Sequence, residues 1–561
     1  MFRLATPARW AIVLVMVIAI GGSLRYRLLG DHGQAWKYAI NNDGKGYYEH
    51  LRVLLVDGDF RSEHGESWMF APAGDGKAIK FFVGTALIQA PYVLAAHAYT
   101  LLFSNGPQDG YSLQYHLAIV LSALVSLLLG LWFTRGLLLG MGVGEFATAF
   151  MLVAITLGTG LLVQTVVHPG MSHVHSFAAV AGFLLAARRA WSLGGAWRWM
   201  LVGGLLGLVI ILRPVDMLLL LGLPLATIGI APPVHRTRWN DLACFAIAFG
   251  AVLLVQGAAW YVQCGEWIVR PYSNEGFHWD RPAFLQHLFS ARNGLLFYWP
   301  VLLVLVPGLW TLAQRTPYRA AIFVMFLALF GYVTSAWWNW SYGDSFGQRP
   351  YVDILALFAI PMAFAIDPKR GRWQRWIVYA CIPLILLNVF QSWQYATHVL
   401  DPARMDLSKY AYVFLRTDPA RGAALGGIQD LPPYAPQGMF PVLDTNATWQ
   451  PDSSGTMHWI VPPARAGSWL WYVELDITRT EFEPGAAQRI EALLDGSSTG
   501  WPGEGVRFKV EHLPVEGLGS KGWKNTLRIP PQTAGDTIAL HLDVPNGCRM
   551  DAAFLRVMAP N

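Results

Sequence analysis

Blocks of apolar residues alternate with short polar connections over the first 400 residues of the chain. Most blocks contain about 20 residues, which is the length that a helix needs to cross roughly 30 Å of hydrocarbon. The first block lies within residues 1–30, and the later ones lie at about 81–103, 113–134, 145–166, 172–192, 199–213, 216–231, 241–263, 295–314, 319–338, 350–366 and 375–395. This pattern predicts a mainly α fold, a polytopic transmembrane bundle of about 11–13 helices.

The N-terminal segment has the features of a first transmembrane helix rather than those of a cleaved signal peptide. Arg3 and Arg9 precede its apolar run, and Arg25 and Arg27 close it. The small-residue cleavage site that marks a signal peptide does not follow the run. We therefore expect an uncleaved helix whose N-terminus is cytoplasmic.

Basic residues gather in four of the connections. They are Arg188, Arg189 and Arg198; His235, Arg236 and Arg238; Arg315 and Arg319; and Lys369, Arg370, Arg372 and Arg375. Connections rich in Lys and Arg stay in the cytoplasm, and these four alternate with the remaining ones. The opposite face should therefore receive 168–171, 264–293, 339–349 and everything after about 396.

The polar stretch 31–80 follows one crossing, so it should be the first extracytoplasmic loop. Three apolar blocks separate it from 168–171, and both can be outside only if one block does not cross. The block at 81–103 is the candidate. Gly84 and Pro91 weaken a straight span there, and surrounding protein could shield a re-entrant or interfacial segment.

From about residue 431 the pattern changes to short segments in which apolar and polar residues alternate, separated by Gly, Pro, Asn and Asp. The clearest examples are 469–477 and 538–544. Period-two runs between turn residues predict an antiparallel β-sandwich. We expect a transmembrane domain at 1–395, a linker at 396–430 and an extracytoplasmic β-sandwich domain at 431–561.

The composition excludes a chain of several soluble domains. Apolar residues make up 54% of the sequence and charged residues 14%, whereas a soluble domain carries about a quarter charged residues. The formal net charge of +5 gives no reason to expect nucleic acid as a partner. Four cysteines are too few for a disulfide framework, and their spacing does not suggest a zinc site.

The first loop contains a candidate catalytic acid, Asp43. An aspartate beside the membrane can accept a proton from a hydroxyl that attacks carbon, and Gly44 and Gly46 would let the backbone bend there. An alternative is that Asp43 caps the helix expected to follow it. The local sequence by itself favours the cap.

The order of residues in this loop resembles that of the GT-C glycosyltransferases, which include the protein O-mannosyltransferases and the lipid A aminoarabinose transferase. The matching residues are Asp43, Tyr47, Gly58-Asp59 and Lys80, followed by a helix that contains proline. Looser matches are His168-Pro169-Gly170-Met171-Ser172-His173, Arg213-Pro214, Ser290 to Gly294, Trp337-Trp338-Asn339-Trp340 and Ser345-Phe346-Gly347-Gln348-Arg349. Together they cover about the first 400 residues.

The resemblance implies roles for individual residues. Asp43 corresponds to the catalytic acid proposed for that superfamily, and Lys80 to a lysine near the donor phosphate. Gly44 is a departure, because many relatives have a second acid there, so the resemblance leaves open whether a carboxylate pair operates. Asp57 and Asp59 form a DxD pair of the kind that oligosaccharyltransferases use for a metal, but we interpret them first as helix-end and loop residues.

Two arginines are candidates for the leaving phosphate, because a planar guanidinium suits phosphate geometry. Arg349 follows a polar, glycine-bearing segment of the outer face and is the preferred candidate, although it could be an interfacial anchor. Arg213 stands where two apolar blocks meet. It would either pair with Asp216 to hold a broken helix or contribute to a phosphate cradle.

Further residues are candidates for contacts with substrate. They are Tyr47, Tyr48, His173, Asp344 and, in the aromatic-rich loop 264–293, Trp279. The cluster His168, His173 and His175 is a weak metal site, because a helix turns positions 173 and 175 to different faces. A divalent metal is therefore possible but not predicted, and no other cofactor is expected.

The resemblance, added to the membrane pattern, implies an integral-membrane glycosyltransferase that moves a sugar from a polyprenyl-phosphate donor to a glycan, lipid or protein acceptor outside the cytoplasm. Asp43 as base predicts an inverting reaction. The expected location is the bacterial inner membrane, with the C-terminal domain periplasmic. Alternatives are a flippase or transporter, which also has many helices and intramembrane charge, and a non-catalytic envelope assembly protein.

Overall fold

A computed structural model of the chain describes the first 417 residues with short gaps and the strands that follow them. The described residues are 6–30, 33–61, 63, 65–104, 107–230, 237–272, 275–367, 373–400, 405, 407–417, 439–444, 456–460, 470–482, 489–496, 506–511, 521–528, 535, 537–543 and 548–560. The chain divides into two compact units, Met1–Ser392 and Trp393–Asn561, which are described separately.

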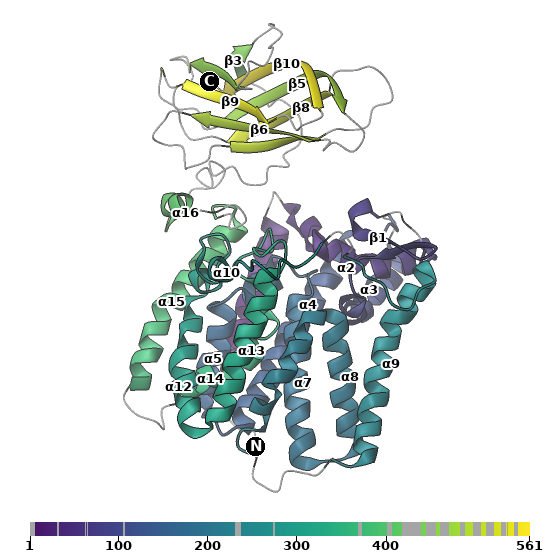
Figure 1. Cartoon of the computed structure of the whole chain (residues 1–561), viewed down its shortest axis with the longest axis vertical. Helices are drawn as coiled ribbons and strands as arrows, with labels where there is room; N and C mark the ends of the chain where they lie inside the picture. Colours follow the sequence, from purple (N-terminus) through teal and green to yellow (C-terminus); the bar gives the residue numbers. More distant parts are fainter. Residues whose placement is uncertain are drawn as a thin grey trace. The chain divides into compact units, whose positions relative to one another are not determined.

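The first unit is built almost entirely from helices (Figure 1). The longer α-helices are α1 (Pro7–Leu24), α2 (Asp43–Arg52), α3 (Gly84–Phe103), α4 (Leu113–Gly140), α5 (Glu145–Leu157), α7 (His173–Leu193), α8 (Ala196–Leu212), α9 (Trp239–Cys264), α12 (Leu305–Arg315), α13 (Pro317–Ala336), α14 (Leu355–Ile366) and α15 (Trp373–Ala396). The short ones are α6 (Leu161–Val166), α10 (Phe284–Phe289) and α11 (Leu295–Tyr298). Tighter or wider helical turns are η1 (Arg25–Leu29), η3 (Ala35–Ala39), η4 (Val53–Asp57), η5 (Ser67–Met69), η6 (Pro214–Thr227), η7 (Pro300–Val304) and η8 (Arg349–Val352).

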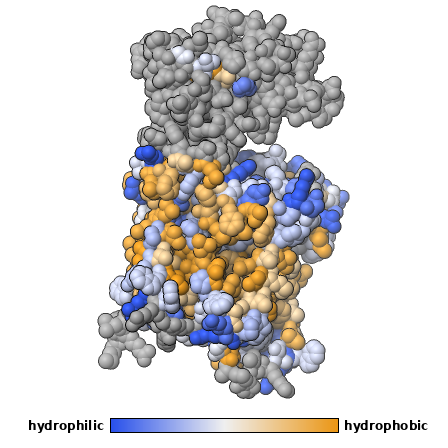
Figure 2. Space-filling view, turned by 60° about the vertical axis from the view of Figure 1, so that its left-hand side comes forward, coloured by the Kyte–Doolittle hydropathy of each residue, from blue (hydrophilic) through white to orange (hydrophobic). Residues whose placement is uncertain are grey.

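One face of the first unit is largely apolar. Figure 2 shows a hydrophobic band between two more hydrophilic ends. Six helices of the described part are long and apolar enough to cross a membrane: Pro7–Leu29, Gly84–Phe103, Leu113–Gly140, Trp239–Cys264, Pro317–Ala336 and Trp373–Ala396. In α9 only 11% of the most apolar window is buried, so lipid must cover the rest. The chain is a multi-pass integral membrane protein, as its composition predicts.

Helix α14 forms the centre of the bundle. All twelve of its residues are buried, and α7 is buried along most of its length. A helix that is apolar all round is stable only when other elements cover it on every side. Residues at the start of α7 and just before α14 therefore lie inside the protein.

The connections meet at the two ends of the bundle as the distribution of basic residues predicts. At one end, which Figure 1 shows carrying α2 and β1, Asp43 contacts Arg349, Gly44 approaches Gly170, and Lys80 contacts Glu275. We call this the first-loop end. At the other end, the Arg188 guanidinium donates to backbone carbonyls of Gly140, Ala226 and Ile228.

Helix α3 lies along the first-loop end instead of descending through the bundle. Gly84, at its start, packs against the backbone of Ile211 at the end of α8. His97, which stands about 20 Å further along a helix, bonds the Tyr115 hydroxyl in the first turn of α4 at 2.6 Å. Helix α3 is long enough to cross a membrane and continues through Pro91. Both of its ends nevertheless contact residues at the first-loop end of the bundle. This placement agrees with the interpretation that block 81–103 does not cross.

A small two-stranded sheet completes the first loop. Strands β1 (Phe70–Ala73) and β2 (Gly76–Ile79) pair antiparallel, with Phe70 opposite Ile79. The Cys264 carbonyl accepts a hydrogen bond of 3.1 Å from the backbone N–H of Asp75 in the turn between the strands. The hairpin is thereby attached to the end of α9.

The second unit contains α16 (Leu407–Val413) and eight strands. They are β3 (Met439–Asp444), β4 (Thr456–Ile460), β5 (Leu470–Phe482), β6 (Arg489–Gly496), β7 (Val506–Glu511), β8 (Lys521–Arg528), β9 (Thr537–Asp543) and β10 (Cys548–Pro560). They form two four-stranded antiparallel sheets, in the orders β3-β10-β5-β8 and β4-β9-β6-β7. The described parts of the two alternating segments, 470–477 and 538–543, fall in β5 and β9. A β-sandwich and the domain limits at 395 and 431 stay predictions, and most of the expected linker lies outside the described residues.

Candidate functional site at the first-loop end

Asp43 stands in the first turn of α2, at the first-loop end. Asn42 occupies the capping position, with a φ of 50° and a ψ of −140°, and its side chain makes no capping hydrogen bond. Asp43 therefore is not the capping residue, which was the alternative that its local sequence favoured. Its carboxylate instead accepts a hydrogen bond of 2.8 Å from a terminal nitrogen of Arg349, which lies 306 positions later in the chain.

The start of α2 packs closely against the loop that contains Gly170. A Cβ placed on Gly44 would lie 3.0 Å from the carbonyl carbon of Gly170 and 3.2 Å from its Cα. A side chain at Gly44 would therefore press against backbone, which cannot move aside as a side chain can.

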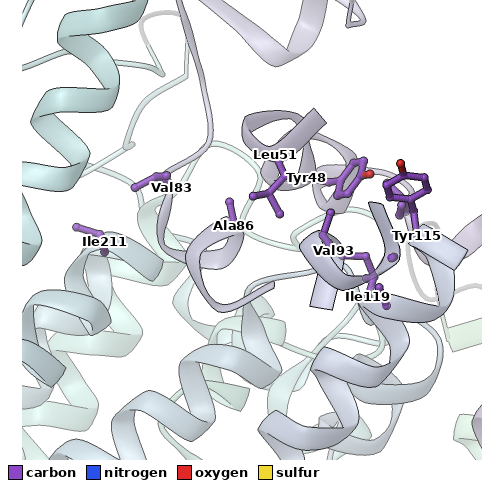
Figure 3. Close-up of a cluster of buried hydrophobic side chains, with 11 residues drawn as sticks. Tyr48, Leu51, Val83, Ala86, Val93, Tyr115, Ile119 and Ile211 are labelled. Carbon is purple, nitrogen blue, oxygen red and sulfur yellow. The ribbon is translucent and has the colours of Figure 1, made fainter. Parts of the chain in front are cut away.

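The rest of the first loop anchors α2 through a buried cluster of apolar residues (Figure 3). Tyr48 and Leu51 of α2 pack with Val83 and Val93 of the α3 region and with Ile119 of α4. Burial of such side chains stabilises the packing by roughly 1.5–3 kcal/mol each. The position of Asp43 is consequently set by helix packing and not by a mobile loop.

Behind Asp43 lies a chain of buried polar groups. Tyr47, one turn along α2, accepts a hydrogen bond of 3.3 Å from the Ser172 hydroxyl, and Arg213 Nη1 lies 3.5 Å from the same hydroxyl. Arg213 Nε is 2.8 Å from one carboxylate oxygen of Asp353, and His173 Nδ1 is 2.9 Å from the other. The polar chain thus joins α2, α7, the α8–η6 break and the start of α14.

Three helices point their N-termini at this place. Asp43 is in the first turn of α2, His173 is the first residue of α7, and Asp353 comes just before α14. Unpaired backbone N–H groups give each helix start a partial positive charge, which favours anions. Together with Arg213 and Arg349 they make this end of the bundle a suitable environment for a phosphate.

Lys80 contacts the loop 264–293. Its ammonium forms an ion pair with Glu275, whose second oxygen accepts a 3.2 Å hydrogen bond from the Trp338 indole N–H. The ammonium also lies 5.1 Å from the ring centroid of Tyr272. Tyr272 is buried, which raises its pKa well above the ordinary value, with smaller contributions from the negative charge of Asp43 and from Tyr47. Lys80 therefore borders the site through Tyr272.

The structure does not bring every predicted substrate residue to Asp43. The Tyr48 hydroxyl is buried in the cluster of Figure 3 and donates to the Gly110 carbonyl at 2.6 Å. Trp279 is half exposed and stacks on Phe277 with ring centroids 4.6 Å apart. Both contacts are therefore with residues other than Asp43, and the roles assigned to Tyr48 and Trp279 stay predictions.

Asp344 and His168 border the site together. Burial lowers the pKa of His168 to about 4, while the negative charge of Asp344 opposes that shift. His168 is therefore neutral near pH 7. His173 and His175 bond different partners, Asp353 and Ser126, as their different faces on a helix predict. Among the described residues, no group of three metal-ligating side chains was found.

The DxD pair has structural partners. Asp57 accepts two hydrogen bonds of 3.0 Å from Arg52, which also binds Glu49. Asp59 accepts a 2.9 Å bond from the backbone N–H of Arg61. The interpretation of both as helix-end and loop residues is confirmed.

Two residues of the site were not found by sequence reasoning. Asp353 follows Arg349 by four positions and was included in an apolar block. An acid at the start of such a block is unusual and indicates a candidate functional residue. Pairing of Arg213 with Asp216 was one of two alternatives. The structure pairs Arg213 with Asp353 instead, and Asp216 accepts a hydrogen bond of 2.6 Å from the Ser176 hydroxyl. Glu275 was missed because loop residues give no periodic pattern.

The fold and the site define a class: a multi-pass integral membrane protein with a carboxylate and several cations gathered where helix N-termini converge. No protein-family model and no curated protein matches the chain. Two solved structures resemble it at 13% identity and a TM-score of 0.38: the oligosaccharyltransferase AglB from Archaeoglobus fulgidus, solved with an inhibitory peptide and a dolichol-phosphate, and the arabinosyltransferase EmbB from Mycobacterium smegmatis.

These matches are partial. They cover 69% of this chain and 55% of AglB, and 100% of this chain and 65% of EmbB. The chain therefore spans less than two thirds of the length of either. Both proteins belong to the GT-C superfamily that the sequence resembles. Likeness at this level does not transfer an activity, so the chemistry has to be derived from the residues of the site.

Proposed function

We propose that the chain is a glycosyltransferase that takes a hexose or pentose from a polyprenyl-phosphate donor and passes it to an acceptor hydroxyl outside the cytoplasm. The observation that carries the proposal is the Asp43–Arg349 pair at the convergence of three helix starts. It places a carboxylate, which can accept a proton, directly beside a cation, which can bind a phosphate. Glycosyl transfer from a phosphate needs both groups at adjacent positions.

In the proposed reaction the acceptor oxygen forms a bond to the anomeric carbon as the bond from that carbon to the phosphate oxygen breaks. Asp43 takes the proton of the acceptor hydroxyl, and the polyprenyl phosphate leaves with the bonding electron pair. Attack from the face opposite the phosphate inverts the anomeric configuration. The phosphate is a stable anion, so the site has to supply positive charge rather than an acid.

Arg349 is the proposed phosphate ligand, because it is the cation nearest to Asp43 and its side chain is 16% exposed. Arg213 supports it from the buried side, and Lys80 from the loop side. A membrane-embedded bundle suits a donor with a lipid tail, which would lie among the helices while its phosphate reaches the first-loop end. The second unit, proposed to be a β-sandwich, would orient the acceptor.

The test is replacement of Asp43 by asparagine, with Asp59→Asn as the matched control from the same loop. Membranes that contain each variant are supplied with labelled polyprenyl-phosphate sugars, and sugar transfer to endogenous glycans is followed by mass spectrometry. Loss of a general base should lower transfer roughly 10²–10⁴-fold. Asp59→Asn should transfer at the wild-type rate, because Asp59 bonds a backbone N–H in an exposed turn.

The stereochemistry of the product gives an independent check. NMR of the released glycan should show the anomeric configuration opposite to that of the donor, and retention would contradict a single displacement. Unchanged transfer in Asp43→Asn would refute the role of Asp43. If the wild-type protein moves lipid-linked sugars across vesicles without forming a new glycosidic bond, the chain is a flippase.

A further inference from the structure

A buried carboxylate that the proposed reaction does not use lies behind the site. Asp353 is fully buried, and each of its oxygens meets a different partner. One oxygen is 2.8 Å from Arg213 Nε, and the other is 2.9 Å from His173 Nδ1. A buried carboxylate is costly unless cations or donors surround it, so its presence needs an explanation.

We propose that Asp353 is a positioning residue: its buried carboxylate holds the Arg213 guanidinium and the His173 imidazole in the orientations with which they serve the phosphate and the acceptor. This inference rests on the proposed function. In the proposed reaction Asp353 does not contact the substrate; it acts through Arg213 and His173.

The contact with Arg213 fixes the direction of the guanidinium. Arg213 Nε lies 2.8 Å from Asp353 Oδ2 as an ion-pair contact, although the two atoms are not aligned as a hydrogen bond. A terminal nitrogen of the same guanidinium lies 3.5 Å from the Ser172 hydroxyl, which bonds Tyr47 one turn from Asp43. A guanidinium has five donors in a rigid plane, so a ligand at Nε determines where the other four point.

The contact with His173 selects one form of the imidazole. When Nδ1–H donates to the carboxylate, Nε2 carries a lone pair and can only accept. Nε2 is buried and has no hydrogen-bond partner among the described residues. Unpaired buried acceptors are rare in folded proteins, so this nitrogen is available to accept a hydrogen bond from a substrate hydroxyl.

The neighbouring acid differs from Asp353 in its partners. Asp216 accepts a hydrogen bond of 2.6 Å from the Ser176 hydroxyl and lies beside Asp353. Two adjacent carboxyl groups do not both ionise readily. Asp216→Asn changes the neighbouring carboxyl group in the same way but leaves both contacts of Asp353 in place, which makes it a matched control.

The first experiment measures binding of farnesyl phosphate to the full-length protein in detergent. A negative charge near a bound phosphate repels it, so neutralising Asp353 would strengthen binding if Coulomb repulsion were its only effect. The positioning role predicts that neutralising Asp353 weakens binding instead. Asp353→Asn should weaken binding roughly tenfold, and Asp216→Asn should leave it within about twofold. Tighter binding by Asp353→Asn, or equal weakening in both variants, would overturn the proposal.

A second experiment uses the unchanged protein, so it does not depend on a variant that folds. Nitrogen-15 NMR of labelled histidine, with His173→Gln to assign the signal, reports which ring nitrogen carries the proton. Protonated Nδ1 and unprotonated Nε2 near pH 7 are expected. The reverse tautomer or an imidazolium would overturn the proposal. The tautomer can be measured without transferase activity, so failure of the proposed glycosyl transfer is distinguishable from failure of this inference.

Discussion

Replacing Arg349 by glutamine should separate the catalytic contribution of this residue from its contribution to stability. The substitution removes the charge and the fork-shaped donor set but keeps a polar side chain of similar reach. Arg349 has two contacts that matter, the 2.8 Å hydrogen bond to Asp43 and a position 6.0 Å from the ring centroid of Tyr342.

The stability cost should be small. Two unit charges 2.8 Å apart attract by about 1.5 kcal/mol in a water-like medium and about 6 kcal/mol at an effective dielectric constant of 20. The Asp43 side chain is 37% exposed, so solvent screening brings the value towards the lower figure. Exposed pairs of this kind contribute about 0–1 kcal/mol. We expect a loss of no more than about 1 kcal/mol in the free energy of unfolding.

The loss of activity should be much larger. A preorganised donor that faces developing charge contributes roughly 10²–10³-fold to the rate. Transfer from labelled polyprenyl-phosphate sugar should therefore fall by that factor while the melting temperature changes by a few degrees. Arg349→Lys keeps the charge without the planar fork, so it should be intermediate.

Arg292→Gln is the control for this experiment, because Arg292 is an exposed arginine of the same end of the bundle. It should match the wild type in both measurements. If Arg349→Gln transfers sugar within threefold of the wild-type rate, Arg349 does not bind the leaving phosphate. If activity and melting temperature fall together to an extent that unfolding accounts for, the residue is structural.

Three further predictions concern the surroundings of the pair. Gly44→Ala should destabilise the protein by about 1–3 kcal/mol, because the added Cβ would press on the Gly170 backbone. Thermal unfolding measures this loss, and Gly276→Ala, where space is open, is the control that should leave stability unchanged. Glu275→Gln should tighten farnesyl phosphate binding roughly two- to tenfold by releasing the Lys80 ammonium; weaker binding would exclude Lys80 as a phosphate ligand. Burial lowers the pKa of His50 from 6.5 to about 4, so the folded state resists protonation. Stability should be fully present above pH 6.5 and fall as pH drops towards 4, and His50→Gln should flatten that loss in melting curves.

The helical part of the fold could be predicted because membrane insertion leaves a strong record in sequence. Apolar blocks of the right length mark the spans, and Lys and Arg mark one face. The contacts of Asp43 with Arg349 and of Lys80 with Glu275 confirm that the first loop shares its face with 264–293 and 339–349. The break at Arg213 was also visible, since α8 ends at Leu212 and η6 begins at Pro214.

The partners inside the site could not be predicted, since each joins residues far apart in the chain. Asp43 and Arg349 are separated by 306 positions, and His173 and Asp353 by 180. A local pattern indicates only that a charge stands at a helix end and not which opposite charge it meets. This is why the sequence offered Asp216, three positions away, as one possible partner of Arg213 and did not indicate Asp353.

A purely structural role does not explain why the buried charges of Arg213 and Asp353 are present. An ion pair between Arg213 and Asp353 could be replaced by apolar residues with little or no loss of stability, and α14, which follows Asp353, is apolar throughout. The chain nevertheless places that pair beside His173, whose Nε2 has no partner among the described residues. The charges of Arg213 and Asp353 lie next to the unpaired His173 Nε2 and near the exposed Asp43 carboxylate. A bound ligand that interacts with these groups explains them better than stability does. A phosphate for Arg213 and Arg349, with a hydroxyl for His173, fits each of these incomplete groups.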